Sequence, residues 1–373
     1  MRNVLRALLT IASLFLALSA RAAVTAGICD PSAHENYIAW PDANPVWQLC
    51  WVRALYSSGA NGSGLEVRNV YYNGHLVMKR GHVPMLNVQY LQLGCDCDCY
   101  RDWLDEEHAF VSSNVISDGY SEPTEGCPQT VCELGGGTDC PADVPPPPAP
   151  PPCPSWVCFT GVAAEKRADH LTLTTQMAAG WYRYDMKWTF WQDGRIEPRF
   201  CFAAINSGCV SCSHNHHAYW RLDFDIDGSV PNIVTEGPNP PAVASPGRPG
   251  PKPRIVTLSN ETMRLINYPG ITWTVTDPAA KRGYRLVPGT ETALPADAFS
   301  QGDLWALRYH ANEIDDGHSL INCPVDFSPW LNNEALNGDV VLWYRSGWLH
   351  PEGDLGPFDP VGPTLYPVGD WSP

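Results

Sequence analysis

The residues of this chain best suited to chemistry are two histidines, His214 and His216, which are separated by a single residue. They begin a segment in which every second residue is apolar, namely Trp220, Leu222, Phe224 and Ile226. Residues two apart share a face of a β-strand, so the pattern predicts that both imidazoles face the interior and that His217 faces away. Two imidazoles at this spacing on a buried face suit a divalent copper or zinc ion.

A third histidine, His350, follows a buried strand predicted at residues 339–344, after a bend marked by Gly347. By itself it is an ordinary loop histidine, and it becomes interesting only as a third imidazole ligand. Three imidazoles around zinc, with an activated water, would serve a hydrolase. Such a hydrolase needs an acid/base group nearby, for which Glu197 and Asp223 are the candidates.

Residues 181–190 form a second segment of interest, in which aromatic and polar side chains alternate and Tyr182 and Tyr184 share the apolar register. The alternation predicts a half-buried strand with both tyrosines on its buried face. Asp193 and Gly194 then indicate a hairpin turn, and residues 195–202 the returning strand. On the pattern alone, Tyr182 is a core aromatic residue.

The elements that would position these residues are mainly β-strands. The 373 residues include 36 Pro, 31 Gly, 15 Trp and 15 Tyr, which is typical of a turn-rich all-β protein. Lys and Arg together number 24 against 40 Asp and Glu, so the formal net charge is −16. An acidic chain argues against nucleic acid and anionic membrane surfaces as partners, because phosphate binding needs clustered cations.

The N-terminus predicts the compartment. Residues 1–22 resemble a secretory signal peptide, in which Arg2 and Arg6 precede an apolar run and a small-x-small cleavage pattern ends at Ala22. We therefore expect an exported protein, periplasmic or secreted, with no membrane attachment after cleavage. Fourteen cysteines, an even number, fit disulfides formed in an oxidising compartment.

Proline-rich stretches punctuate the chain. Residues 141–154 predict an extended connector, because proline cannot supply backbone donors to a sheet. We expect residues 23–140 to form a cysteine-rich N-terminal part of a β-sandwich, and residues 155–373 to form the core that carries the histidines and tyrosines. The prolines need not separate independent domains, since a long insertion in one β architecture would look the same.

Together these segments resemble the copper amine oxidases. The family's tyrosine strand and the turn after it correspond to Trp181-Tyr-Arg-Tyr184, Trp188-Thr-Phe190 and Gly194-Arg-Ile-Glu197. Its His-x-His strand, which ends in Arg-Leu-Asp and an Asp-Gly turn, corresponds to residues 214–228, and its Gly-Tyr-Arg strand to residues 283–285. Asn333-Glu334, the strand at residues 339–343 and Gly347-Trp-Leu-His350 then follow in the family's order. The resemblance is good from about residue 158 onward and weaker from residue 86 to residue 102.

The resemblance implies an all-β fold, a large twisted β-sandwich rich in disulfides and with proline-rich insertions. It implies a copper ion held by His214, His216 and His350. It also implies that Tyr182 is the precursor of the quinone cofactor topaquinone, with Trp181 and Tyr184 beside it. The implied reaction is the oxidation of a primary amine by dioxygen to an aldehyde, ammonia and hydrogen peroxide, carried out by a homodimer.

The chain departs from the family near this cofactor. Trp181 stands where the family has an Asn that helps to orient the quinone, and Arg183 replaces an acidic residue. The family's Asp-x-Gly-x-x-Gly segment, which carries its catalytic Asp, is missing before Gly94. The base is therefore unknown; another carboxylate could replace it, and the sequence does not choose among Asp96, Asp98, Asp102 and others.

Three functions stay open. One is an exported quinone-dependent amine oxidase with an altered base, another is an exported copper-binding relative without turnover, and the third is the zinc hydrolase. The identity of the metal separates the third from the others, and quinone formation at Tyr182 followed by turnover separates the first two. The row of Asp223, Asp225 and Asp227 predicts either a solvated strand face or part of a peripheral calcium site.

Overall fold

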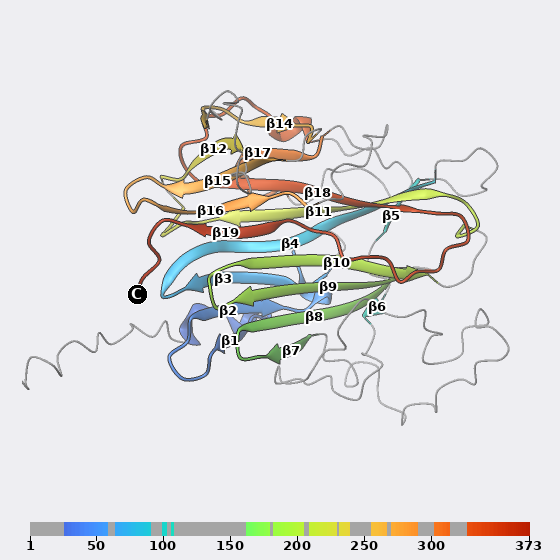
Figure 1. Ribbon diagram of the computed structural model, residues 1–373, viewed down its shortest axis with the longest axis horizontal. Coiled ribbons are helices and arrows are strands. Elements are labelled where there is room, and N and C mark those ends of the chain that lie inside the picture. Colours follow the sequence, from blue (N-terminus) through green and yellow to red (C-terminus); the bar gives the residue numbers. More distant parts are fainter. Residues whose placement is uncertain are drawn as a thin grey trace, which may run out of the picture.

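The computed structural model describes residues 26–58, 64–90, 99–102, 106–107, 162–179, 182–204, 209–229, 231–238, 255–266, 270–289, 302–313 and 327–373. These residues form two large antiparallel sheets (Figure 1), which confirms the predicted all-β sandwich. No helix among them is long and apolar enough to cross a membrane. The predicted signal peptide at residues 1–22 and the connector at residues 141–154 lie outside the described residues and stay predictions.

The first sheet contains nine of the described strands. In spatial order they are β1 (Asn36–Trp40), β2 (Trp47–Val52), β3 (Glu66–Tyr72), β4 (His75–Tyr90), β11 (His214–Phe224), β18 (Val340–His350), β17 (Leu304–Arg308) and β14 (Thr262–Arg264), while β5 (Cys99–Asp102) pairs with β4. Strands from both ends of the chain therefore share one sheet, and β11 lies between β4 and β18.

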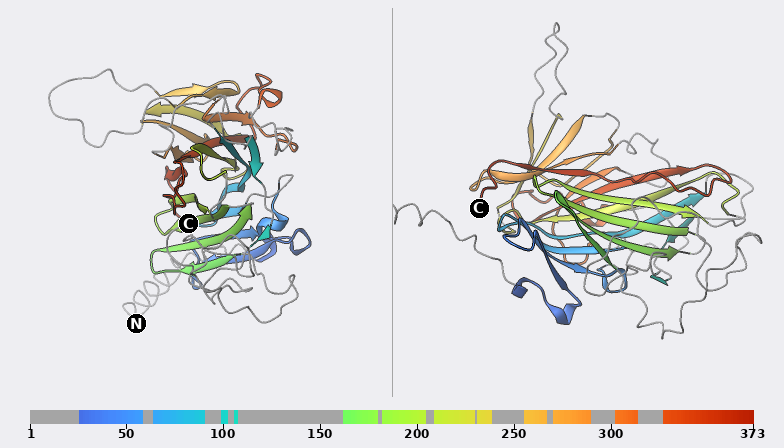
Figure 2. Two further views of the ribbon diagram at one scale, coloured as in Figure 1. Left: turned by 90° about the vertical axis from the view of Figure 1, so that its right-hand side faces the viewer. Right: turned by 60° about the horizontal axis from the view of Figure 1, so that its bottom comes forward.

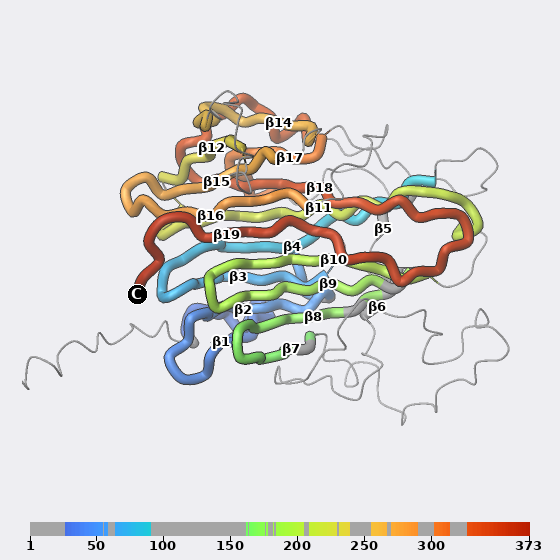
Figure 3. The backbone as a smooth tube through the Cα atoms, viewed as in Figure 1, coloured from blue at the N-terminus to red at the C-terminus, as the bar shows by residue number. Residues whose placement is uncertain are grey.

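The second sheet contains ten of the described strands. In spatial order they are β13 (Val256–Leu258), β12 (Ile233–Pro238), β15 (Ile271–Asp277), β16 (Arg282–Val287), β19 (Thr364–Val368), β10 (Ile196–Ala204), β9 (Tyr182–Trp191), β8 (His170–Ala179) and β6 (Glu106–Glu107), while β7 (Ala163–Lys166) pairs with β8. The chain trace shows β18 leading through a loop to β19, so that the last strands connect the two sheets (Figure 3).

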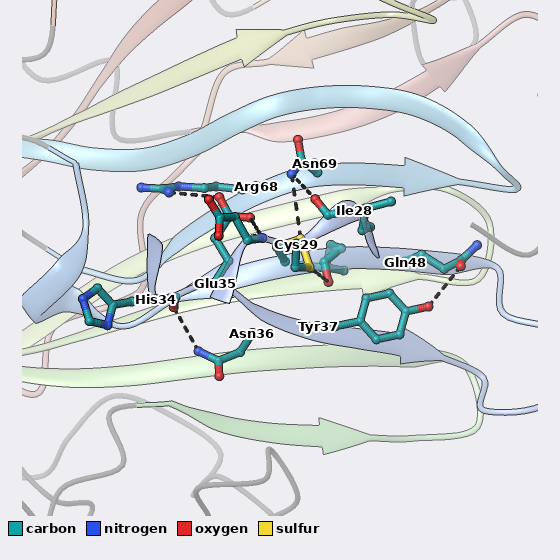
Figure 4. The surroundings of a disulfide bond; sticks show 12 residues. Ile28, Cys29, His34, Glu35, Asn36, Tyr37, Gln48, Arg68 and Asn69 are labelled. Atoms are coloured by element: carbon teal, nitrogen blue, oxygen red, sulfur yellow. Dashed lines mark hydrogen bonds and ion pairs between the residues drawn. A yellow bond between two sulfur atoms is a disulfide. The ribbon is translucent and has the colours of Figure 1, made fainter. Parts of the chain in front are cut away.

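Short 3₁₀ turns complete the described elements, namely η1 (Ala26–Ile28), η2 (Pro31–Ala33), η3 (Ala54–Tyr56) and η5 (Ser328–Trp330). The turns η1 and η2 lie beside a disulfide between Cys29 and Cys50, which ties the N-terminal segment to β2 (Figure 4). Cys201, Cys209 and Cys212 are also disulfide-bonded. None of the described cysteines is free, as the sequence predicts for an oxidising compartment.

The hairpin predicted around the tyrosines is confirmed. Strands β9 and β10 pair from Tyr182 opposite Ala204 to Phe190 opposite Ile196. Gly194 in the connecting turn has φ of +89°, and a Cβ there would lie 2.7 Å from the ring of Tyr72. The turn therefore requires glycine for its backbone conformation and for its close approach to the first sheet.

The two sheets pack against each other, as the right-hand view of Figure 2 shows for the green strands of the second sheet. The central strands β11 and β18 of the first sheet are buried on both faces. Their even-numbered residues belong to the main core between the sheets, for example Trp220, Leu222 and Leu342. Their odd-numbered residues face a second hydrophobic cluster, which contains Met85, Tyr219, Trp305, Leu307, Phe327, Val341 and Trp343. We call these the inner and the outer face of the first sheet.

The prediction that His350 lies in a loop is wrong. Strand β18 continues to His350, which pairs with His214 of β11. The glycine that suggested a bend, Gly347, lies inside the strand, where a Cβ would lie 2.9 Å from the carbonyl oxygen of His216. This glycine allows close strand approach instead of ending the strand.

Candidate metal centre

Three neighbouring strands of the first sheet end side by side. Backbone pairing places Tyr90 of β4 opposite His214 of β11, and His214 opposite His350 of β18. The ring centroid of His214 lies 4.2 Å from that of His350 and 4.9 Å from that of His216. The register of the sheet therefore brings together the three histidines, all of which face inward. His217 faces outward, as predicted, and its Nδ1 lies 2.9 Å from a guanidinium nitrogen of Arg345.

Backbone carbonyl groups fix which ring nitrogen is free in two of the histidines. Nδ1 of His214 lies 2.6 Å from the carbonyl oxygen of Cys212, and Nε2 of His350 contacts the carbonyl oxygen of Asp354. A carbonyl oxygen only accepts, so each of these nitrogens carries the ring proton and donates it. The lone pairs are therefore on Nε2 of His214 and Nδ1 of His350.

The nitrogens that face the centre are deeply buried. All three histidine residues have no measurable solvent exposure. Nε2 of His216 and Nδ1 of His350 have no hydrogen-bond partner among the described residues. Leaving a buried polar atom unpaired costs about 1–3 kcal/mol, and a metal ion bound by these nitrogens would remove that cost.

The spacing of the three imidazoles also fits one metal ion. A ring nitrogen from each histidine lies within 4.8 Å of the other two. With metal–nitrogen bonds of about 2.0–2.1 Å, two nitrogens on opposite sides of an ion lie about 4.2 Å apart, so small ring movements complete the site. The donor set is neutral nitrogen only, which suits copper and zinc and disfavours calcium or magnesium.

The surroundings keep the imidazoles uncharged. Burial lowers the pKa of His214 to about 4, helped by repulsion from His350 and partly offset by the bond to the Cys212 carbonyl. Burial, and then repulsion from the neighbouring histidines, lowers the pKa of His216 well below its ordinary value. Burial also lowers the pKa of His350. At neutral pH the three rings therefore offer lone pairs instead of protons, as metal binding requires.

Two tyrosines from the second sheet reach these histidines. The hydroxyl of Tyr182 lies 2.8 Å from Nε2 of His214, and the hydroxyl of Tyr184 lies 3.0 Å from Nδ1 of His216. Both tyrosines are almost completely buried, and both lie on the inner face of β9. Tyr182 therefore stands on the side of His214 from which a metal would bind, which distinguishes it from an ordinary core aromatic residue.

Sequence reasoning missed Tyr90. Its hydroxyl lies 3.0 Å from the hydroxyl of Tyr182, and its ring centroid lies 4.4 Å from that of His214. Tyr90 is the last residue of β4. Its pairing with His214 depends on long-range register, so no local pattern could single it out.

Aromatic side chains lie between the three histidines and the rest of the core. Phe202 stacks on His216 with centroids 4.2 Å apart, and Phe358 stacks on Phe202 at 4.3 Å. Phe358 also meets His350 edge-on at 4.7 Å. These apolar rings limit the space for water around the nitrogens and hold the imidazoles in place.

A second group of ligands lies on the outer face of the same strands. Carboxylate oxygens of Asp223, Asp225 and Asp339 lie within 4.8 Å of one another. Asp223 is 3% exposed and Asp225 is 8% exposed, so a solvated strand face was the wrong prediction for these two residues. The third residue of the predicted row, Asp227, is 24% exposed and pairs with His75 and Arg282.

These outer carboxyl groups repel one another. Burial, and then the nearby Asp223 and Asp339, raises the pKa of Asp225 to about 7. Burial and Asp223 raise the pKa of Asp339 to about 6. One carboxylate oxygen of Asp225 and one of Asp339 have no hydrogen-bond partner among the described residues. The guanidinium of Arg221 divides its contacts between Asp223 at 3.5 Å and Glu313 at 3.1 Å.

The predicted acid/base candidates of a hydrolase lie far from the histidines. Glu197 is seven residues along β10 from Ala204, which pairs with Tyr182. Asp223 is seven residues along β11 from His216 and faces the outer side. Seven residues of strand span about 23 Å, so neither carboxylate reaches the centre. Trp181, Asp96 and Asp98, and the side chains of Arg183 and Asp102, lie outside the described part of the chain.

Comparison with known proteins points to one family. The family model of the copper amine oxidase enzyme domain matches residues 158–354. A copper-containing amine oxidase (gamma 1) of Arabidopsis thaliana is 24% identical over 250 residues, covering 52% of this chain and 35% of that protein. A peroxisomal copper-containing diamine oxidase of Nicotiana tabacum is 24% identical over 339 residues, covering 76% of this chain and 40% of that protein. The chain thus spans well under half the length of these relatives.

Solved structures show the same fold. The lysyl oxidase of Pichia pastoris matches with a TM-score of 0.56 at 15% identity, over 90% of this chain and 52% of that chain. The amine oxidase of Aspergillus nidulans matches with a TM-score of 0.55 at 16% identity, over 89% of this chain and 51% of that chain. Likeness at this identity shows the architecture of the sandwich alone.

Proposed function

Because this chain belongs to the copper amine oxidase family, we propose that it is a copper-dependent oxidase of primary amines. The proposed products are an aldehyde, ammonia and hydrogen peroxide, with dioxygen as the oxidant. The proposed cofactor is topaquinone, formed from Tyr182 after copper binds. The observation that carries this proposal is the position of the Tyr182 hydroxyl, 2.8 Å from the metal-facing nitrogen of His214.

Each residue of the centre has a role in the proposal. Nε2 of His214, Nε2 of His216 and Nδ1 of His350 would hold copper. When bound, copper supplies the redox chemistry with dioxygen that oxidises a neighbouring phenol. Tyr90 holds the Tyr182 hydroxyl through a hydrogen bond, which fixes the direction of that ring. Phe202 and Phe358 keep the centre dry, which protects reactive groups from water.

Amine oxidation also needs a base that removes a proton from the carbon next to the amine nitrogen. The sequence between Tyr90 and Cys99 contains Asp96 and Asp98. This segment connects β4 and β5, two strands that pair next to the site. We propose that the base comes from this segment. Asp96→Asn and Asp98→Asn, made one at a time, test this proposal. The variant that lacks the base should still form the quinone but should lose turnover.

The copper-binding relative without turnover is the second candidate. It is favoured by Trp181 in place of the family's Asn and by the missing Asp segment. The zinc hydrolase is disfavoured, because Glu197 and Asp223 lie about 23 Å away along their strands. Copper binding is common to the first two candidates, so quinone formation at Tyr182 followed by turnover separates them.

We further propose that Asp223, Asp225 and Asp339 bind a calcium ion with a structural role. Calcium prefers carboxylate and carbonyl oxygens. The support is that Asp225 is 92% buried, has an unpaired carboxylate oxygen and belongs to a group of three carboxylates. A cation there would relieve both the repulsion between the carboxylates and the unpaired oxygens.

The amine oxidase proposal is tested by a visible absorption spectrum. The protein is produced without metal and given Cu(II) in air, beside a Tyr182→Phe control. Separate samples are then treated with phenylhydrazine and with a panel of primary amines. A quinone band that appears with copper, shifts with phenylhydrazine and is absent in the control supports the cofactor, and peroxide release supports turnover. Copper bound at one ion per chain without a quinone band would leave the copper-binding relative.

A further inference from the structure

Two tyrosines of β9 face two histidines of β11 across the space between the sheets, but they contact opposite ends of the imidazole rings. Tyr182 meets His214 at Nε2, the nitrogen that carries the lone pair. Tyr184 meets His216 at Nδ1, while Nε2 of that ring faces the centre without a partner among the described residues. Tyr182 therefore lies on the metal-facing side of His214, whereas Tyr184 lies on the side of His216 that faces away from the metal.

The position of His216 in the strand explains why a side chain is needed there. His214 and His350 lie at strand ends, where the nearby carbonyl groups of Cys212 and Asp354 accept their ring protons. His216 lies inside β11, paired on one side with Val88 and on the other with Trp348. Backbone carbonyl groups within a sheet are engaged in the ladder, so the acceptor for His216 comes from the opposite sheet.

We propose that Tyr184 is a positioning residue of the metal centre. Its hydroxyl oxygen accepts the Nδ1 proton of His216, which keeps the lone pair of Nε2 directed at the metal. An imidazole that binds a metal through Nε2 carries its single proton on Nδ1, so the tautomer decides whether the ring can bind a metal at Nε2. This inference rests on the proposed function, because it requires His216 to be a copper ligand.

The Tyr184 hydroxyl is held firmly enough for this role. The side chain is 1% exposed, and its ring centroid lies 5.4 Å from that of Phe200 and 5.7 Å from that of Phe202. Phe202 also stacks on His216. The same aromatic residue thus contacts both partners of the hydrogen bond and keeps their relative orientation.

The test is the copper affinity of Tyr184→Phe, measured without dioxygen by competition with a chelator. Removing an outer partner of a metal-bound histidine typically costs about 10–100-fold in metal affinity, and we expect a loss in that range. Tyr284→Phe is the matched control, because Tyr284 is fully buried and donates to the carbonyl oxygen of Gly194 at 2.7 Å. We expect wild-type copper affinity for this control and a similar fall in melting temperature for both variants.

The electron paramagnetic resonance spectrum of bound Cu(II) gives a second readout, which loss of packing alone would not change. We expect altered nitrogen coupling in Tyr184→Phe and a wild-type spectrum in Tyr284→Phe. If the wild type binds copper and Tyr184→Phe matches it in affinity and spectrum, the inference about Tyr184 is wrong while the copper proposal stands. If the wild type does not bind copper, the proposed function itself fails.

Discussion

Two groups of metal-ligating side chains share strands β11 and β18 but lie on opposite faces of the first sheet. The histidines occupy the inner face, where aromatic rings surround them. The aspartates lie on the outer face, beside Arg221 and its partner Glu313. One pair of strands therefore offers neutral nitrogen ligands on one side and charged oxygen ligands on the other, so the faces should select different ions.

The outer face carries a cluster of charged side chains around Glu66. Glu66 on β3 contacts Arg68 at 2.5 Å and Arg80 at 3.0 Å, and it is fully buried. Burial alone would raise the pKa of Glu66, but His82 and the two arginines lower it to about 2. Charge pairs should therefore dominate the pH dependence of the outer face, while packing should dominate the stability of the inner face.

The largest effect on stability is expected from Glu66→Gln. Breaking a fully buried ion pair costs about 3–5 kcal/mol; Glu66 is fully buried but its partners Arg68 and Arg80 are 13% and 25% exposed, so we expect a loss toward the lower end of that range. Urea unfolding of the metal-free protein measures this loss. Glu197→Gln is the control, since Glu197 is partly exposed and pairs with Arg195 at 3.0 Å, and such a pair contributes about 0–1 kcal/mol. Equal losses in the two variants would contradict a special role for the cluster around Glu66.

The contribution of Glu66 should disappear in acid. Its folded-state pKa is below the ordinary value of 4.5, so its stabilisation is present above pH 4.5 and is lost as the pH falls toward 2. A shift of this size corresponds to about 3 kcal/mol. The difference in unfolding free energy between wild type and Glu66→Gln should therefore shrink between pH 5 and pH 2. A difference that stays constant over this range would show that the carboxylate is not held ionised.

On the inner face, we expect His216→Ala to lower copper affinity by about 100-fold or more, because losing a ligand costs more than losing its outer partner. The neighbouring His217→Asn is the control, since His217 faces outward and contacts Arg345. Chelator competition measures both affinities. A copper affinity in His217→Asn that falls as far as in His216→Ala would break the distinction between the two faces.

A smaller effect is expected from calcium on the outer face. Calcium at 100 times its dissociation constant adds about 2.7 kcal/mol of stability, which raises the melting temperature by a few degrees in a chain of this size. Asp225→Asn should abolish most of this rise and leave copper affinity unchanged. A wild-type melting temperature that does not respond to calcium would contradict the calcium proposal.

Much of the arrangement of side chains on the inner face could be predicted from the sequence, because the patterns that indicate it are local. Alternation placed His214 and His216 on one face and predicted the tyrosine hairpin. The pairing of His214 with Tyr90 and with His350 joins segments more than a hundred residues apart, and no local pattern encodes that register. The glycine at position 347 misled the prediction for His350, since glycine serves close strand packing as well as bends.

The outer face was harder to predict, because alternation of charged and apolar residues normally marks a solvated surface. Asp223 and Asp225 follow that pattern and yet are buried. The signal that could have corrected it is the aromatic character of the polar register in neighbouring strands, where Trp305 and Trp343 occupy the outer face. A strand with large apolar residues on both faces is buried on both faces.

The most direct test of the proposed metal centre is the mass of the peptide that contains Tyr182, after Cu(II) is added with and without dioxygen. We expect that Tyr182 gains two oxygen atoms and loses two hydrogen atoms only when both copper and dioxygen are present, and that Tyr90 and Tyr184 stay unmodified. An unchanged Tyr182 in protein that holds one copper ion per chain would contradict the oxidase proposal. A modification at Tyr184 instead would contradict the inference that Tyr182 lies on the metal-facing side of His214 and Tyr184 on the opposite side of His216.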